Sequence, residues 1–171
     1  MTFNNDLFKG KTAVVTGGTT GIGAGVALKL AALGATVVAI GFNHEALAVP
    51  ANLDLRAMEI DVTDTPALQN LFDALPRLDI LINCAGVIRR GEEHEIEVFE
   101  KVIDINLNGT MRCCRLAREK LAASGGTIVN TASMLSFFGG GLVPAYSASK
   151  GAVMQLTKSL AIAYAADGIR V

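Results

Sequence analysis

The most constraining feature of the sequence is an apolar strand that passes through a glycine-rich turn into a helix. Residues 11–16 form a short apolar run, and the turn Thr16–Gly23 (Thr-Gly-Gly-Thr-Thr-Gly-Ile-Gly) follows it directly. A helix should come next, because apolar residues then recur at helical spacing, at Ile22, Val26, Leu30 and Leu33. A strand that turns at glycines into a helix is typical of the first unit of a parallel α/β sheet.

The rest of the chain repeats this alternation of strands and helices. Residues 36–40 (Thr-Val-Val-Ala-Ile) show no alternating polar pattern, which is typical of a strand buried on both faces. Further strands are predicted at residues 56–61, 78–83 and 127–132, and helices at 65–75, 95–122 and 144–166. In the last helix we expect four residues to face inward: Val153, Leu156, Leu160 and Ala163. Residues 41–55 contain Pro50 and lack helical periodicity, so a loop or a short irregular helix is expected.

This order of elements predicts the fold class. Strands and helices that alternate through right-handed crossovers form an α/β protein with a three-layer, doubly wound parallel sheet of the Rossmann-like type. No linker divides residues 1–171, so we expect a single domain.

Composition and charge exclude several classes of protein. The formal net charge of the 171 residues is -1 and basic and acidic residues are intermixed, so neither nucleic acid nor a membrane surface is an expected partner. No apolar run is long enough to cross a bilayer, and the N-terminus does not resemble a secretory signal. The three cysteines (Cys84, Cys113 and Cys114) lack metal-ligand spacing and predict free thiols in a reducing compartment. A cytoplasmic protein without a metal site is expected, since His44 and His94 also lack ligand partners at suitable spacing.

The glycine turn is a candidate site for a dinucleotide. Glycines let the backbone approach a pyrophosphate closely, and the N-terminus of the following helix offers amide donors and a partial positive charge. The spacing here is G-x-x-x-G-x-G, which differs from the commoner G-x-G-x-x-G. The alternative is a tight strand-to-helix turn that needs glycine for steric reasons alone.

A second candidate site is the pair Tyr146 and Lys150, which lie four residues apart and therefore about one helical turn from each other. A tyrosine hydroxyl ordinarily titrates near ~10, and a fixed positive charge nearby favours its ionised form. The pair suggests an acid/base catalyst. Taken alone, the spacing also occurs by chance on many helices.

Further segments follow in a fixed order: residues 61–62 (Asp-Val), 83–86 (Asn-Cys-Ala-Gly), 106–109 (Asn-Leu-Asn-Gly) and 128–133 (Ile-Val-Asn-Thr-Ala-Ser). With the glycine turn and the Tyr146–Lys150 pair, they resemble the short-chain dehydrogenase/reductase family, from about Lys11 to the end of the chain. The resemblance implies an oxidoreductase that transfers a hydride between a nicotinamide cofactor and a secondary alcohol or ketone.

The resemblance also implies where the cofactor binds. Pyrophosphate and ribose would contact the turn, at Gly17, Thr19, Thr20, Gly21, Ile22 and Gly23. Asp61 and Val62 would lie against the adenine, and Asn83, Ala85 and Gly86 would line the cofactor beyond the fourth strand. Cys84 departs from the usual second asparagine of that segment, which we expect to be tolerated.

The choice between NAD and NADP depends on charge near the adenine ribose. A carboxylate at the end of the second strand favours NAD, and a nearby arginine favours the 2′-phosphate of NADP. The expected positions, Gly41, Phe42 and Asn43, carry no acid, and Thr20 stands where NADP-preferring members often have a basic residue. Because no charge is present to neutralise a phosphate, NAD is the preferred expectation and NADP the alternative.

The same resemblance implies four catalytic residues. Tyr146 would exchange a proton with the substrate oxygen, Ser133 would hydrogen-bond that oxygen, and Lys150 would favour the phenolate and bind the nicotinamide ribose. Asn106 would hold a water that links Lys150 to solvent. Two of the four residues also have a purely structural interpretation: Asn106 could satisfy backbone groups in a helix kink, and Ser133 could form a turn.

Two segments resemble the sugar-acid dehydrogenases typified by 2-deoxy-D-gluconate 3-dehydrogenase: residues 85–90 (Ala-Gly-Val-Ile-Arg-Arg) and 132–137 (Ala-Ser-Met-Leu-Ser-Phe). Arg89 and Arg90 could bind a substrate carboxylate. The alternatives are a solvated arginine pair neutralised by Glu92 and Glu93, and a reductase of acyl-carrier substrates or small ketones.

The sequence stops at residues 168–171, where the next strand of the family fold should begin. The expected fold is therefore incomplete at its C-terminal end, because family members continue with a substrate lid and a final strand. A nucleotide-binding or regulatory fragment whose site no longer turns over is the alternative function. By resemblance, helices that begin near Glu95 and Pro144 would pair between subunits, so a homo-oligomer (a dimer or tetramer) is expected.

Overall fold

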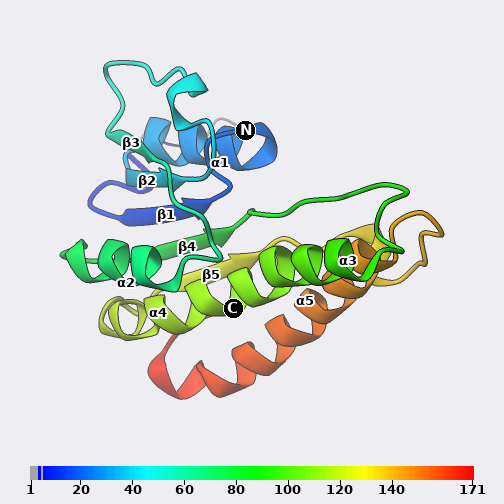
Figure 1. The fold of residues 1–171 in the computed structure, drawn as a ribbon. Helices are drawn as coiled ribbons and strands as arrows, with labels where there is room; N and C mark the ends of the chain where they lie inside the picture. Colours follow the sequence, from blue (N-terminus) through cyan, green and yellow to red (C-terminus); the bar gives the residue numbers. More distant parts are fainter. Residues whose placement is uncertain (1–3, 5) are drawn as a thin grey trace.

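The computed structural model, which describes residues 4 and 6–171, contains a five-stranded parallel sheet of order β3-β2-β1-β4-β5 (Figure 1). The strands are β1 (Thr12–Thr16), β2 (Thr36–Ile40), β3 (Leu55–Met58), β4 (Ile80–Asn83) and β5 (Thr127–Asn130). The chain builds the sheet outward from β1 in one direction and then returns to add β4 and β5 on the other side. This confirms the doubly wound parallel sheet, and it brings the carboxyl ends of all the strands to one edge.

Three strands are shorter than the sequence predicts. The ladder between β2 and β3 ends where Ile40 lies opposite Met58, so residues 59–61 continue beyond the sheet. In the same way, β5 ends at Asn130, which lies opposite Asn83. The strand β4 ends at Asn83 as predicted, but it begins at Ile80 and not at residue 78. Residues past these points have no neighbouring strand to pair with, so they form the loops at the carboxyl edge.

Five α-helices accompany the strands: α1 (Gly21–Ala32), α2 (Thr65–Ala74), α3 (Ile96–Ile103), α4 (Gly109–Ser124) and α5 (Pro144–Ala163). A π-helical turn, η2 (Asp104–Asn108), joins α3 to α4, so the single helix predicted over residues 95–122 is interrupted. Short 3₁₀ turns occur at η1 (His44–Ala46), η3 (Met134–Ser136) and η4 (Ala165–Asp167). The turn η1 confirms the short irregular helix expected within residues 41–55.

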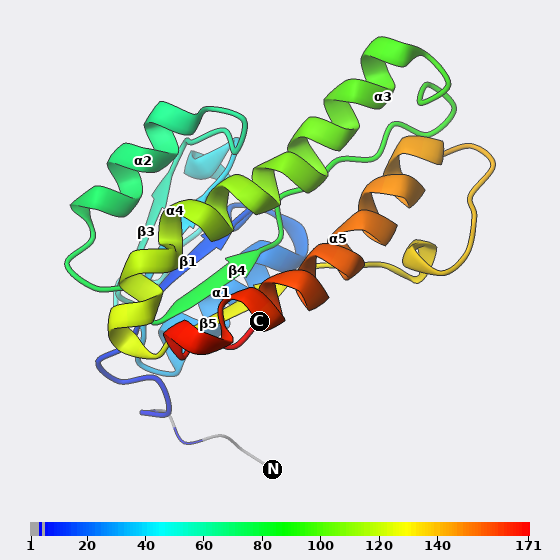
Figure 2. The same ribbon diagram turned by 90° about the horizontal axis from the view of Figure 1, so that it is seen from below.

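The helices form two layers around the sheet (Figure 2). On one face α1 packs over β1, β2 and β3, with Ala13, Val15 and Ile82 in that core. On the other face α2, α4 and α5 cover Val14, Leu81 and their neighbours. Beyond the carboxyl edge, α3 and the first half of α5 project together past the sheet and contact each other.

The cover of the sheet is uneven, because α1 does not extend over the last strands. Val129 of β5 lies on the α1 side and is 48% exposed. An apolar groove of about 330 Å³ follows β4 and β5 on that face, with Phe8, Leu30 and Ile80 among its walls. Arg170 makes one parallel bridge to Thr127 beside this groove.

Two apolar residues at helix ends are exposed, and one of them, Ala163, was expected to face inward. Ile22 is 76% exposed because it lies in the first turn of α1, which begins beyond the strand ends. Ala163 is exposed as the last residue of α5, and Tyr164, the next residue, is buried in its place. The ring of Tyr164 packs 4.5 Å from the guanidinium carbon of Arg118.

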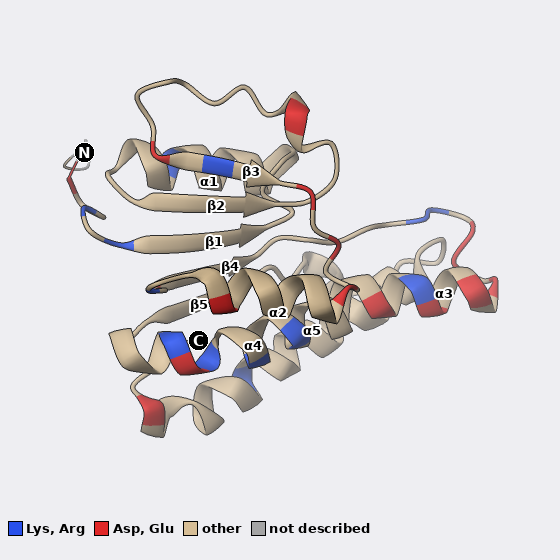
Figure 3. Ribbon diagram, turned by 60° about the vertical axis from the view of Figure 1, so that its left-hand side comes forward, with Lys and Arg blue, Asp and Glu red and all other residues tan. Residues whose placement is uncertain are grey.

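Charged side chains lie mainly on the helices and loops, and both signs alternate along the outer helices (Figure 3). No single-sign stripe is visible, in agreement with the net charge of -1. Within the described residues, no helix combines the length and the apolar character needed to span a bilayer.

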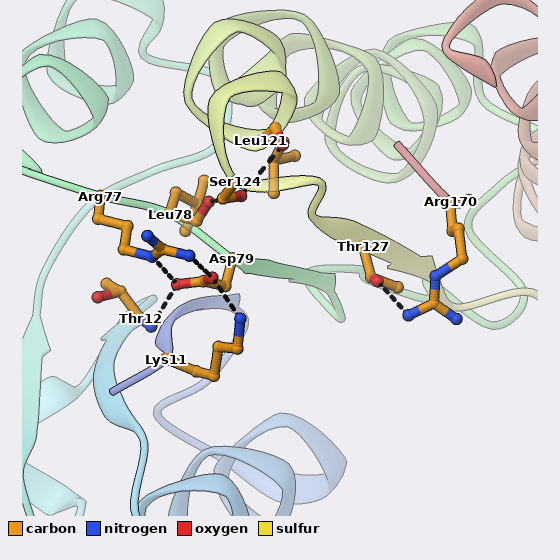
Figure 4. Close-up of polar contacts among 9 residues, drawn as sticks. All are labelled: Lys11, Thr12, Arg77, Leu78, Asp79, Leu121, Ser124, Thr127 and Arg170. Carbon is orange, nitrogen blue, oxygen red and sulfur yellow. Dashed lines mark hydrogen bonds and ion pairs between the residues drawn. The ribbon is translucent and has the colours of Figure 1, made fainter. Parts of the chain in front are cut away.

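The amino edge of the sheet holds a compact ionic cluster around Asp79 (Figure 4). The carboxylate is 4% exposed and accepts hydrogen bonds from Arg77, from Lys11 Nζ at 3.0 Å and from the Thr12 amide at 3.0 Å. Desolvation alone would raise the pKa of Asp79, but these donors outweigh it and hold the pKa well below its ordinary value. The cluster joins the starts of β1 and β4.

Candidate active site

The glycine turn between β1 and α1 leaves an open helix N-terminus at the carboxyl edge. Gly17 has a φ of 60°, and a Cβ there would lie 2.8 Å from the Ala85 Cα atom. A Cβ on Gly23 would overlap the Gly17 carbonyl. Thr20 precedes the helix without making a side-chain capping hydrogen bond, and the first turn contains no acidic residue. The first amides of α1 are thus free to bind an anion such as a pyrophosphate.

A pocket of about 240 Å³ opens beside this turn. Seven of the predicted cofactor-binding residues line it: Gly17, Thr19, Thr20, Asp61, Val62, Ala85 and Gly86. Gly21, Ile22 and Gly23 form the adjacent start of α1. Val62 is held from below by Gly109, where a Cβ would lie 2.7 Å from Val62 Cγ2. The glycines and the free amides are therefore suited to a dinucleotide.

The packing at the end of β2 explains why position 41 carries no acidic side chain. Thr19 is 4% exposed, and its hydroxyl donates to the Phe42 carbonyl at 2.7 Å. A Cβ on Gly41 would lie 2.6 Å from Thr19 Oγ1. Thr19 fills the space that a side chain at position 41 would need. Asp61 is the only charged residue among those that line the pocket.

The end of β4 is tied to its neighbours on both faces. Asn83 is buried, and its amide donates to Asn130 Oδ1 at 2.9 Å and to Cys114 Sγ at 3.3 Å. Its side chain therefore lies in the core, away from the pocket, which differs from the prediction that Asn83 lines the cofactor. Cys84 accepts a hydrogen bond from the Thr131 hydroxyl at 3.3 Å, which links the ends of β4 and β5.

Two cysteines are structural. Cys113 and Cys114 are 0% exposed, and desolvation raises the pKa of both thiols, that of Cys114 to about 12. Because thiolates are the reactive form, this burial makes them inert. The sequence-based expectation of free thiols agrees with this packing.

Asn106 lies at the centre of the π-helical turn and is completely buried. Its side chain donates to the Val87 carbonyl at 2.9 Å and to Ser149 Oγ at 3.0 Å, and it accepts from the Val87 amide at 2.8 Å. These bonds use the side chain to hold the segment after β4 against α5. The side chain thus satisfies the backbone groups of Val87, which lies outside the irregular helix. A water would have to bind the Asn106 backbone carbonyl, which already accepts from the Thr110 hydroxyl at 2.8 Å.

Tyr146 and Lys150 lie together on the first turns of α5. The Lys150 nitrogen is 5.6 Å from the centre of the Tyr146 ring and donates to the Thr131 carbonyl at 2.6 Å. Lys150 is 5% exposed, and no ion pair to it is found among residues 4 and 6–171. Desolvation lowers the pKa of Lys150, and the nearby Cys84 thiol opposes the shift.

Ser133 follows β5 and begins η3. Its hydroxyl accepts from the Leu135 amide at 3.2 Å, and the Ser136 hydroxyl donates to the Lys150 carbonyl at 2.7 Å. The turn that carries Ser133 is thereby fastened to α5. In this arrangement the Ser133 hydroxyl makes the contact expected of a serine that forms a turn.

Sequence reasoning missed two supporting residues. Thr16 ends β1, and its hydroxyl accepts from the Ala85 amide at 3.1 Å. Glu93 is completely buried and accepts from the backbone amides of Arg89 and Tyr146, each at 2.7 Å. Glu93 was expected to neutralise an arginine pair in solvent, and its burial corrects that alternative. The sequence gives only a weak signal for the burial of Glu93, because Glu93 lies in a loop with several other charged residues.

Comparison with known proteins identifies the family. A sequence model described as short chain dehydrogenase matches residues 11–171. The chain belongs to the short-chain dehydrogenase family. It is thus an NAD(P)-dependent oxidoreductase of the class that acts on CH–OH groups.

The relatives of this dehydrogenase are named for different alcohol substrates. It is 41% identical to a 2-dehydro-3-deoxy-D-gluconate 5-dehydrogenase of Bacillus subtilis, over 100% of this chain and 72% of the relative. A 3beta-hydroxysteroid dehydrogenase of Mediterraneibacter gnavus is 40% identical over 95% of this chain and 63% of its own length.

Solved structures of the family superpose closely on the dehydrogenase. A short-chain type dehydrogenase/reductase from Mycobacterium ulcerans matches 96% of this chain with a TM-score of 0.88 and 31% identity. A protein from Beutenbergia cavernae, described as an NAD(P) dependent gluconate 5-dehydrogenase and holding NADP at low occupancy, matches 97% with a TM-score of 0.86 and 35% identity. The chain spans 66% and 71% of these structures, in agreement with a fold that is incomplete at its C-terminal end.

Proposed function

We propose that the dehydrogenase transfers a hydride between a nicotinamide cofactor and a secondary alcohol or ketone, with Tyr146 as the acid/base. The observation that supports this most directly is the buried Lys150 ammonium 5.6 Å from the centre of the Tyr146 ring. A Cβ on Gly86, which lines the pocket, would lie 3.7 Å from the Lys150 nitrogen, so the pair lies next to the pocket. Burying an ammonium without an ionic partner is unfavourable, so its retention requires a reason other than stability.

In the oxidation direction, the Tyr146 phenolate accepts the proton of the substrate hydroxyl. Lys150 stabilises the phenolate by its charge. The Ser133 oxygen accepts from the Leu135 amide, so the Ser133 O–H stays available to donate to the substrate oxygen. A water on the Asn106 backbone carbonyl returns the proton to solvent through Lys150. When bound along the glycine turn, the nicotinamide supplies the acceptor for the hydride.

The proposed substrate is a sugar acid or a polyol. The named activities of the Bacillus subtilis relative and of a D-threitol dehydrogenase, 38% identical, support this class. Arg89 and Arg90 are exposed on the segment after β4 and offer donors for a carboxylate. A hydroxysteroid is the second candidate, because Met134, Phe137 and Phe138 are 64–75% exposed in the loop that follows Ser133.

We further propose that NAD is preferred to NADP. The pocket residues include neither arginine nor lysine, and a 2′-phosphate would carry its charge there without a cation. We also propose a cytoplasmic homo-oligomer that pairs through α3 and α5, since these helices project from the sheet and Ile96 on α3 is 65% exposed.

The test is an assay with NAD or NADP and a panel that contains a sugar acid, a polyol and a hydroxysteroid. We expect reduced cofactor to accumulate with one of these alcohols, and kcat/KM to be higher with NAD. A higher kcat/KM with NADP would contradict the cofactor preference alone. Cofactor binding by calorimetry without turnover of any alcohol would instead support the nucleotide-binding or regulatory alternative.

A further inference from the structure

Glu93 is a buried carboxylate without an ionic partner among the described residues. It is 0% exposed, and both of its oxygens accept backbone amides: Oε1 accepts from Arg89 and Oε2 from Tyr146. A buried charge is unfavourable unless hydrogen bonds and nearby dipoles compensate it. Here the compensation comes from the backbone on two sides of the site.

The Tyr146 amide is one of the free donors at the start of α5. The helix begins at Pro144, so the amide of its third residue has no acceptor within the helix. The positive end of the helix dipole also favours an anion at this position. Glu93 therefore fixes the first turn of α5 from outside the helix.

The other amide belongs to the segment that follows β4. Val87 in this segment is fastened to Asn106 by the bonds described above. Two further contacts join the same connection to the loop before α5: the Gly91 amide donates to the Leu142 carbonyl at 2.8 Å, and His94 Nε2 lies 3.0 Å from the Gly141 carbonyl oxygen. Glu93 lies within this contact and bonds the residue that carries the phenol.

We propose that Glu93 is a positioning residue, which holds the backbone of Tyr146 against the segment after β4 and so fixes the phenol in the site. The proposal rests on the proposed role of Tyr146. Lys150, one turn further along, is held separately by the Thr131 carbonyl and the Ser136 hydroxyl. Loss of Glu93 should therefore loosen Tyr146 while Lys150 stays in place.

The test compares Glu93→Gln with Asp79→Asn. Glutamine has the size of glutamate, but its oxygen can accept only one of the two amides and its NH₂ group opposes the other. Asp79 is also a buried carboxylate that accepts a backbone amide, and it lies at the opposite edge of the sheet. Comparing the two variants therefore shows whether an effect on activity comes from the position of Glu93 or from the loss of any buried carboxylate.

We expect Glu93→Gln to lower kcat about tenfold without changing the cofactor Kd, because a displaced phenol slows chemistry and not binding. Asp79→Asn should keep the wild-type kcat when both are assayed well below their melting temperatures. Glu93→Asp, which retains the charge but is one methylene shorter, should also lower kcat. If Glu93→Gln does not fold, Glu93→Asp is used for the test in its place.

Amide hydrogen exchange gives a readout that does not need turnover. The amides of residues 145–147 should exchange about tenfold faster in Glu93→Gln than in the wild type. In Asp79→Asn their exchange rates should equal those of the wild type. Unchanged exchange at these residues, or equal kcat in Glu93→Gln and the wild type, would overturn the proposal. If the wild type turns over no alcohol, the proposed function is rejected. If amide exchange is nevertheless faster in Glu93→Gln, Glu93 still holds the first turn of α5 in place.

Discussion

The two edges of the sheet treat buried charge in opposite ways. At the amino edge, Asp79 is paired with Lys11 and Arg77 and is also bonded to the Thr12 amide. At the carboxyl edge, Lys150 and Glu93 are also buried, yet within the described residues their charged side-chain atoms bond only to backbone groups.

Under the proposed mechanism, the amino edge stabilises the fold and the carboxyl edge carries the chemistry. A paired, hydrogen-bonded carboxylate joins two strands and favours the folded state. An unpaired ammonium disfavours the folded state but can stabilise an anion that forms beside it. Substitutions at the two edges should therefore have opposite effects on activity and stability.

The largest effect is expected for Tyr146→Phe, which removes the proposed acid/base and keeps the ring. We expect kcat to fall about 10³-fold, because general acid–base catalysis contributes 10²–10⁴-fold. The cofactor Kd, measured by calorimetry, should stay close to that of the wild type. The matched control is Tyr164→Phe, at the far end of α5, which should retain kcat. Equal losses in both variants would reject the role of Tyr146.

Lys150→Met should separate activity from stability at the carboxyl edge. We expect kcat to fall about 10²-fold, while the melting temperature stays at or above that of the wild type, because a desolvated ammonium is removed. Lys158→Met, an exposed position on the same helix, is the control and should change neither quantity.

The pH dependence of unfolding gives a further check on Lys150. Its pKa is lowered in the folded state, so the unfolded chain binds more protons between the folded value and about 10.4. Its contribution to stability therefore rises with pH through that interval. A Lys150→Met variant that loses several degrees of melting temperature would show that the ammonium stabilises the fold after all.

The smallest effect on activity, and the clearest one on stability, is expected for Asp79→Asn. Loss of its charge-assisted hydrogen bonds should lower the free energy of unfolding by about 2 kcal/mol and leave kcat unchanged. Because the pKa of Asp79 is lowered, its contribution is present above about pH 4 and is lost as the pH falls below that value.

Urea unfolding of Asp79→Asn and of the wild type at several pH values measures this difference. The gap in free energy should be full near neutral pH and should shrink in acid. Asp73→Asn on the surface of α2 is the control and should show no such gap. A gap that is constant down to the acid limit would mean that the Asp79 charge does not contribute.

Much of the fold and of the pocket followed from the sequence. The apolar runs at β1 and β2 predicted a parallel sheet, and the glycines at positions 17 and 23 predicted the close turn that the structure contains. The role of Tyr146 remains a proposal, although its spacing from Lys150 correctly predicted that the two side chains lie together. Local periodicity and turn chemistry are sufficient for such features because neighbouring residues decide them.

Other features depend on neighbours that are distant in the sequence. Asn83 was expected in the pocket, but Cys114 and Asn130 draw its amide into the core. The register of the sheet decided which face each strand residue takes. A polar Asn106 inside a predicted helix was compatible with a kink, but the π-helical form of that kink was not predicted. A period of two or 3.6 residues specifies an element but not the partners of its side chains.

By itself, the sequence determined a doubly wound α/β fold, the glycine turn and the family, because these depend on hydrophobic periodicity and on short motifs. Only the tertiary structure decided how buried charge is distributed between the two edges of the sheet. In the sequence, Glu93 is one of several acidic residues in a charged loop. It accepts a hydrogen bond from the Tyr146 amide only because folding brings the β4–α3 connection against α5. Burial and hydrogen bonding decide whether a charge stabilises or reacts, and both depend on contacts between distant segments.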